Sequence, residues 1–398
     1  MTRLQRLAIL YGVLFLATNF VLSWLAPGLA YGARGVIGAD FLAFYTAGDM
    51  TLQGRALEAY NFEAFDAALR TRVETENLGL MWQYPPLMFF VAGALALLPY
   101  KLSLWLWLTA TGAAFAWALS RILSAVVPDA GTQRMALLLI LTSPVCMMVV
   151  TSGQISLFTA AFLMTAAFRP RAQWLLAGIA AGVLTLKPQL GVLIPLAFLA
   201  AGAWRAFGVA AVTAIVLHGL SILVFGPESV TAFVDAVVRL QSDVAGSGVN
   251  TPPDNMTTLF GQLRVWDVPS SIAMPAHLAL ASLVLGCTAY LWHRHSSDDD
   301  RGLYLAALLG AGAILVTPYA YAYEMTALAP AALWFAFRPD RYRSVAVILL
   351  AGAWLLLALR RFLALDGLIQ MPFLISLSAF ALIALAGLQR RNRALATD

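Results

Sequence analysis

Long apolar stretches, separated by short charged segments, dominate this chain. The first runs from residue 7 to residue 26 without a charged side chain. About 20 apolar residues are enough for a helix to cross the roughly 30 Å hydrocarbon core of a bilayer. Of all 398 residues, 61% are hydrophobic and 11% are charged, whereas a soluble domain carries about 25% charged residues. The sequence therefore predicts an all-α polytopic membrane protein and excludes a soluble enzyme or a nucleic-acid-binding module.

Apolar segments of this kind recur along the chain, and arginines flank several of their ends. They lie near 7–26, 84–100, 102–123, 135–152, 155–168, 172–186, 190–204, 206–225, 272–292, 303–320, 325–337, 344–359 and 371–388. The positive-inside rule places the flanking arginines and both termini in the cytoplasm. Two cytoplasmic termini require an even number of crossings. We therefore expect about twelve transmembrane helices, with one segment between residues 84 and 168 not crossing fully.

Two longer stretches, residues 27–83 and 226–270, separate these segments, and the same rule places both on the extracytoplasmic side. In the first stretch, apolar residues recur at helical spacing from 41 to 52 and again from 62 to 73. This pattern predicts two short amphipathic helices at the membrane surface. No repeat or soluble domain is evident. Residues 1–398 are thus predicted to form a single integral membrane domain, which begins with an uncleaved signal anchor.

Many of the 20 acidic residues lie in these two stretches, where most of them read as solvated loop residues. Asp40 differs because Gly38-Ala39 precedes it and Phe41-Leu42 follows it, in an apolar and aromatic setting. Desolvating a lone carboxylate is costly, so such a residue needs a partner or a role. Two interpretations remain open: Asp40 is the N-cap of a helix, or it takes part in catalysis.

Lys187 interrupts an otherwise apolar stretch. It either snorkels to the outer interface or marks a functional site, for which a phosphate is a natural counter-ion. Glu324 stands among three tyrosines, which form either an aromatic belt or the lining of a polar site. Further candidate substrate-binding residues are Tyr45, Tyr84, Gln154, Gln189, Asn255 and Tyr319.

Several sequence patterns of soluble enzymes are missing. The chain has no Gly-rich phosphate loop, no cluster with metal-ligand spacing and no nucleophile–His–Asp arrangement. Its two cysteines, Cys146 and Cys287, lie in apolar segments and read as small buried residues. We therefore predict no metal and no cofactor, and an enzyme of this kind would not hydrolyse a cytoplasmic nucleotide.

The marked motifs keep a definite order along the chain. They are the Asp40–Tyr45 block, Leu52-x-Gly54, Ala59-Tyr60-Asn61, Tyr84-Pro85-Pro86, Ser143-Pro144, Gly153-Gln154, Leu186-Lys187-Pro188, the Asn255-centred loop and Thr317-Pro318. In this order and spacing the chain resembles glycosyltransferase family 87 over roughly residues 10–330. The family comprises GT-C membrane enzymes typified by polyprenol-phosphate-mannose-dependent alpha-mannosyltransferases. The block at 319–324 departs from the family pattern because it contains no His, which leaves the second catalytic group and the acceptor open.

The resemblance implies a GT-C-type bundle and a hexosyltransferase. It would move a sugar, mannose first among the candidates, from a polyprenyl-phosphate donor to a hydroxyl of a lipid or glycan acceptor. Transfer would take place on the extracytoplasmic face of a bacterial inner membrane, with inversion at the anomeric carbon. Asp40 matches the general base of the family, and Lys187 is the candidate phosphate contact together with Gln189 or Gln154. The implied partners are the two substrates and membrane lipids, without nucleic acid.

Two other function classes remain open. A transporter or flippase of envelope precursors often shows inverted repeats and charges near the middle of the bilayer, whereas here no repeat is evident and the carboxylates concentrate in the outer stretches. A non-catalytic GT-C-like scaffold protein would share the fold without the chemistry, and the altered block at 319–324 is compatible with it.

Overall fold

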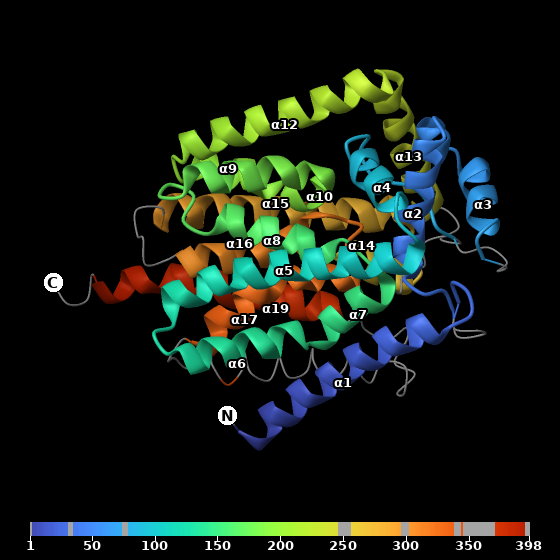
Figure 1. The fold of residues 1–398 in the computed structure, drawn as a ribbon. Coiled ribbons are helices and arrows are strands. Elements are labelled where there is room, and N and C mark those ends of the chain that lie inside the picture. The colour runs from blue at the N-terminus through green and yellow to red at the C-terminus, as the bar shows by residue number, and fades with distance from the viewer. Residues whose placement is uncertain are drawn as a thin grey trace. The chain divides into compact units, whose positions relative to one another are not determined.

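The computed structural model describes residues 2–30, 35–73, 79–245, 256–295, 302–337, 344 and 371–394 (Figure 1). Within these residues the regular elements are helices, accompanied by two isolated β-bridges, Ala30–Val36 and Met256–Tyr321. The chain divides into two compact units. Unit 1 comprises Met1–Ala114, Leu141–Phe158 and Ala214–Pro252, and unit 2 comprises Phe115–Ile140, Thr159–Thr213 and Pro253–Asp398. The predicted all-helical architecture is confirmed for the described residues.

Five described helices are long and apolar enough to cross a membrane. They are α1 (Arg3–Leu25), α5 (Tyr100–Val126), α12 (Trp204–Phe225), α15 (Ser270–His295) and the Pro372–Gln389 part of α19 (Met371–Ala394). A sixth span results if α6 (Ala130–Leu141) and α7 (Pro144–Ser152) form one broken crossing. Helices α1 and α12 leave most of their apolar side chains exposed, as helices facing lipid do. Among the described residues, five or six helices are thus able to cross a membrane, whereas the total of about twelve crossings stays a prediction.

Unit 1 contains a helix at each of the two places that the sequence predicts between residues 27 and 83. Helix α3 (Phe62–Arg70) is amphipathic, with Phe65 and Leu69 buried. Helix α2 (Ala39–Leu52) is instead buried on most sides. Apolar residues occur on every side of this helix, and it packs on α4 (Met88–Ala96). The two helices approach most closely at Gly48, where a Cβ atom would overlap the carbonyl of Ala92. The remaining elements of this unit include η2 (Ala56–Tyr60) and α13 (Glu228–Ala245).

Unit 2 is organised around α16 (Gly302–Val316), whose residues 302–315 are all buried. It contacts α11 (Leu193–Ala200), α15, α17 (Ala329–Ala336), α19 and η6 (Ala322–Leu328) (Figure 1). Gly310 of α16 lies so close to η6 that a Cβ atom there would overlap the carbonyl oxygen of Ala327. This helix is therefore the core of the unit. Two further helices of this unit are α8 (Ser156–Ala167), which begins in unit 1, and α14 (Leu259–Val265).

A break at Lys187 divides the apolar region between residues 172 and 204. Before the break lie α9 (Trp174–Val183) and η3 (Leu184–Leu186), and after it come α10 (Pro188–Gly191) and α11. Pro188 disfavours helical backbone at the residue before it, and Lys187 accordingly adopts φ −136° and ψ 72°. The helices on each side of Lys187 are apolar but shorter than a full membrane crossing, so helix length alone does not show whether this region spans the membrane.

Candidate functional site

Asp40 lies in the first turn of α2 and is half-buried. The N-cap of this helix is Gly38, with φ 63° and no side-chain capping bond. The capping interpretation of Asp40 is therefore not realised, because the helix begins one residue before it. A carboxylate in the first turn is nevertheless favoured by the partial positive charge of the helix N-terminus. Its side chain remains partly accessible at this position.

The backbone in front of Asp40 is held by a tyrosine and two glycines. The Tyr100 hydroxyl lies 2.6 Å from the carbonyl oxygen of Ile37 and 3.0 Å from that of Gly38, and it donates to both. A Cβ atom on Gly38 would press on Leu104, and one on Gly153 would overlap the Cβ atom of Phe41. These close contacts leave little freedom to the turn that presents Asp40.

The motifs around Tyr84 and Gln154 meet the Asp40-bearing helix through aromatic packing. The Tyr84 hydroxyl donates to Gln154 Oε1 at 3.0 Å, and the same oxygen accepts from the backbone N–H of Ile155 at 2.8 Å. The ring of Phe44, one helical turn after Asp40, lies 4.9 Å from that of Tyr84. Gln154 is buried. We call Asp40, Phe44, Tyr84, Tyr100 and Gln154 the Asp40 cluster.

Tyr45 is bound into the neighbouring surface. Its hydroxyl donates to the carbonyl oxygen of Leu98 at 2.8 Å, and the guanidinium of Arg72 lies 5.2 Å from its ring centre. Arg72 in turn forms a salt bridge of 2.5 Å with Asp49. The structure thus gives Tyr45 structural partners, while its predicted role in substrate binding stays a prediction.

Lys187 and Glu324 form a buried ion pair in unit 2. The two residues are 6% and 2% exposed, and Lys187 Nζ donates to Glu324 Oε1. The ammonium also lies 5.3 Å from the ring centre of Tyr323, a cation–π distance. Snorkelling is therefore not what the structure shows for Lys187. We call Lys187, Tyr323 and Glu324 the Lys187 cluster.

The second carboxylate oxygen of Glu324 is buried without a hydrogen-bond donor from the described residues. A buried acceptor of this kind is costly unless a polar group satisfies it. Gln189 is exposed on α10, two residues after Lys187. Glu324 Oε2 can therefore accept a hydrogen bond from a ligand.

The end of the second long stretch, residues 226–270, packs onto the tyrosine-rich block of unit 2. The backbone N–H of Thr257 donates to the carbonyl oxygen of Ala320 at 2.7 Å, and the Thr258 hydroxyl donates to that of Pro318 at 2.8 Å. The ring of Phe260 meets Tyr319 edge-on at 5.7 Å. Asn255, the centre of the predicted loop motif, lies outside the described residues.

Most of the chain matches a known protein family. The family model of glycosyltransferase family 87 matches residues 82–318, more than half of the chain. The chain belongs to glycosyltransferase family 87. No curated protein and no solved structure matches it. Family membership confirms the resemblance and makes the chain a membrane glycosyltransferase, with a sugar donor and an acceptor as its substrates.

The family 87 match covers the predicted site residues unevenly. Tyr84, Gln154 and Lys187 lie inside the matched range, whereas Asp40 and Glu324 lie before and after it. The roles of Asp40 and Glu324 therefore rest on their own surroundings. Among the described residues, no group of three or more His, Cys, Asp and Glu side chains could hold a metal ion.

Sequence reasoning missed two residues that hold the Asp40 cluster in place. Tyr100 holds the turn before Asp40, and Trp107 donates from Nε1 to the carbonyl oxygen of Gly153 at 3.2 Å. In the sequence, these residues stand out only as amphipathic side chains inside apolar segments. Their positions alone do not indicate which groups they contact.

Proposed function

We propose that this family 87 member transfers a sugar, mannose first among the candidates, from a polyprenyl-phosphate donor to a hydroxyl of a lipid or glycan acceptor. The reaction would take place on the extracytoplasmic face of a bacterial inner membrane, in a chain with both termini in the cytoplasm. The observation that carries this proposal is Asp40, a half-buried carboxylate that is not the helix cap and whose backbone is held in place.

Asp40 is proposed as the general base. The acceptor hydroxyl gives its proton to the carboxylate while its oxygen forms a bond to the anomeric carbon. The bond from that carbon to the phosphate oxygen breaks, and polyprenyl phosphate leaves with the electron pair. Attack from the face opposite the leaving group inverts the anomeric centre. A positioned base of this kind contributes about 10²–10⁴-fold to the rate.

Lys187 is proposed as the contact for the donor phosphate. An ammonium has three N–H donors, and Glu324 Oε1 accepts one of them. A phosphate oxygen can accept another, with the exposed amide of Gln189 beside it. The buried Oε2 of Glu324 is an acceptor suited to a sugar hydroxyl. Tyr45, Tyr84, Gln154, Asn255 and Tyr319 remain proposed substrate-binding residues.

Replacement of Asp40 by Asn tests this assignment. Purified protein is incubated with radiolabelled polyprenyl-phosphate mannose and lipid acceptors, and labelled product is measured. We expect Asp40→Asn to lower the transfer rate about 10²–10⁴-fold, because the amide cannot take the proton. Asp49→Asn is the matched control on the same helix. Asp49 pairs with Arg72 and accepts a hydrogen bond from Gln53 Nε2, and the variant should transfer sugar at nearly the wild-type rate.

Two outcomes would contradict the proposal. Asp40→Asn could transfer sugar as fast as wild type, in which case Asp40 is not the base. Wild-type protein in vesicles could instead move the labelled donor across the bilayer without glycosylating any acceptor, which would favour a flippase. Polyprenyl-phosphate glucose, used in parallel, tests the preference for mannose.

A further inference from the structure

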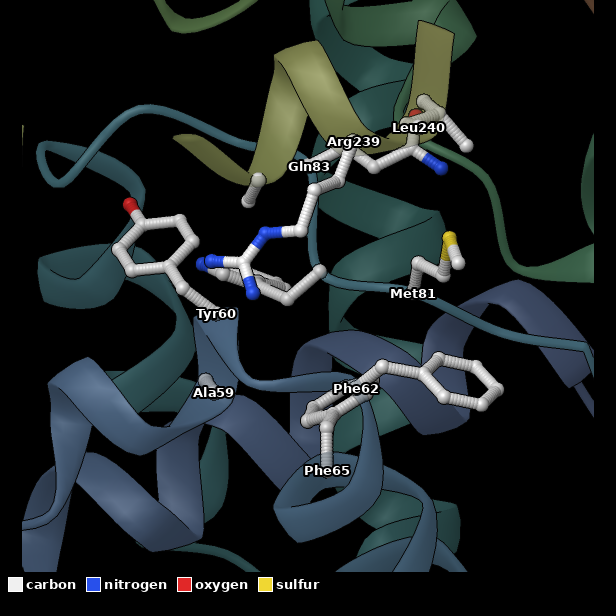
Figure 2. A pocket seen from close by; sticks show the side chains of 10 residues that line it. Ala59, Tyr60, Phe62, Phe65, Met81, Gln83, Arg239 and Leu240 are labelled. Carbon is white, nitrogen blue, oxygen red and sulfur yellow. The ribbon is translucent and has the colours of Figure 1, made fainter. Parts of the chain in front are cut away.

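A pocket lies in unit 1, where residues of the two long stretches, 27–83 and 226–270, meet. Its volume is about 120 Å³. Its walls come from η2, from α3, from the segment before Tyr84 and from α13 (Figure 2). None of the residues proposed for sugar transfer lines it. The lining residues are Ala59, Tyr60, Phe62, Phe65, Met81, Trp82, Gln83, Ala236, Arg239 and Leu240.

Arg239 is the one lining residue with a formal charge. Its side chain extends from α13 toward Tyr60, and Phe62 and Phe65 come from α3 (Figure 2). Its Nε donates at 3.3 Å to the carbonyl oxygen of Asp235 on its own helix. Within the described residues the guanidinium forms no salt bridge. Its other N–H groups can therefore form a bidentate pair with a carboxylate or phosphate.

The rest of the pocket is an aromatic wall that is already ordered. Trp82 is buried and stacks on Phe89, with ring centres 5.4 Å apart. The Tyr60 hydroxyl donates to the carbonyl oxygen of Tyr84 at 2.8 Å. Burial raises the pKa of Tyr60, so its phenol stays neutral at physiological pH. These buried rings fix the back of the pocket, and the half-buried Phe62 and Met81 supply the accessible apolar surface against which the C–H face of a ring-shaped ligand can pack.

Size and lining together limit the ligand. Pockets for drug-sized molecules have volumes of about 300–1,000 Å³, so this one can hold a single ring with a small charged group but not a polyprenyl chain. Gln83 adds an amide that can exchange hydrogen bonds with hydroxyl groups. We propose that this pocket binds an acidic sugar, a hexuronate or a sugar phosphate, with its anionic group on Arg239 and its ring against the aromatic wall.

Direct binding tests this proposal independently of sugar transfer. Calorimetric titration of the purified full-length protein would use methyl glucuronide and glucose 6-phosphate as probes. Methyl glucoside has the ring without the charge, and glycerol 3-phosphate has the charge of a lipid headgroup without the ring. We expect both acidic sugars to bind on the order of tenfold or more tightly than either comparison compound, because only they use the arginine and the aromatic faces together.

Two variants and a matched control locate the site. Arg239→Gln should remove the preference for acidic sugars over methyl glucoside, and Phe62→Ala should weaken binding of every ring-bearing probe. Arg171→Gln removes the same charge from an exposed position in unit 2 and should bind like wild type. Thermal unfolding of each variant shows whether it is folded. Equal affinity for all four probes, unchanged binding by folded Arg239→Gln, or glycerol 3-phosphate binding as tightly as glucose 6-phosphate would overturn the proposal.

Discussion

The Asp40 cluster and the Lys187 cluster hold their charges in opposite ways. Asp40 is a half-buried carboxylate on a backbone held by Tyr100, and its chemistry remains accessible. Lys187 and Glu324 are almost completely buried and neutralise each other. The difference teaches that a charged residue in an apolar sequence can be a partly accessible group or one member of a buried pair on which the fold also depends. The two cases differ in how completely the charge is buried.

The two arrangements also differ in what each charge requires from the protein. A partly exposed carboxylate such as Asp40 retains some of its hydration, so the protein has to replace only part of what water supplies. A buried charge loses its hydration and depends on its partner, because removal of one member leaves the other unpaired. Substitution of Asp40 should therefore affect catalysis, whereas substitution of Lys187 or Glu324 should lower folding stability in addition to use of the donor.

The largest expected effect on stability comes from breaking the buried pair. Lys187→Met or Glu324→Gln alone should lower the free energy of unfolding by about 3–5 kcal/mol, because a buried charge or polar group is left without its partner. The double variant Lys187→Met/Glu324→Met should recover most of this loss, since apolar side chains replace both charges. Unfolding in detergent with increasing denaturant measures all three. Single variants that cost less than about 1 kcal/mol would contradict the buried pairing.

The sequence was enough to predict an all-helical membrane protein, because long apolar segments are the pattern of membrane-crossing helices. It also singled out Asp40 and Lys187, since a charge in an apolar setting is visible without coordinates. It could not decide whether Asp40 is a cap, because that depends on the backbone at Gly38, which has φ 63°. It could not pair Lys187 with Glu324 either, since 137 residues separate them and only tertiary packing brings them together.

The number of crossings shows a further limit of sequence reasoning. The apolar segments predicted at 172–186 and 190–204 do form helices, but the helices on either side of Lys187 are shorter than a full crossing requires. Hydropathy reports how much apolar surface a segment has, whereas the break is set by the local backbone next to Pro188. The family match identifies the kind of enzyme but ends before Glu324 and begins after Asp40. Roles for both residues must come from experiments.

The scaffold that carries Asp40 can be disturbed without touching the carboxylate. Gly48→Ala places a methyl group against the carbonyl of Ala92 and should cost about 1–3 kcal/mol of unfolding free energy by overpacking. Gly93→Ala is the matched control on the facing helix, where the nearest atom is Thr51 Cγ2 at 3.7 Å. It should be neutral or slightly stabilising. Equal effects of the two variants would show that α2 and α4 do not pack as described.

Gly310→Ala applies the same test to the scaffold of the Lys187 cluster. The added methyl group would overlap the carbonyl oxygen of Ala327, three residues after Glu324. We expect destabilisation of about 1–3 kcal/mol, comparable with that of Gly48→Ala. The same unfolding measurement serves both units. A neutral Gly310→Ala would show that η6 does not lie against α16 as the structure has it.

A smaller effect is expected from the hydrogen bond between Tyr84 and Gln154. Tyr84→Phe should cost about 0.5–1.5 kcal/mol of unfolding free energy, because Gln154 Oε1 keeps the N–H of Ile155 as a donor. Tyr45→Phe removes a hydroxyl whose bond to Leu98 lies at the surface, and it should cost less. If Tyr84→Phe also lowers sugar transfer more than Tyr45→Phe does, the orientation of Gln154 matters for the reaction as well as for stability.

The smallest effect on stability is expected from an exposed ion pair. Like the buried pair, it joins a basic side chain to a glutamate, but it lies at the surface. Arg55 and Glu58 form a salt bridge of 2.5 Å, with 45% and 48% of their side chains exposed. The hydrogen bond from Arg55 lowers the pKa of Glu58. The pair therefore contributes stability above the ordinary glutamate pKa of about 4.3, and this contribution is lost as the pH falls through the lowered value. Glu58→Gln should leave the midpoint of thermal unfolding at pH 7 nearly unchanged, and high salt should remove any difference. A shift as large as that of Lys187→Met would mean that burial does not separate the two pairs, and the contrast between accessible and buried charge would have to be abandoned.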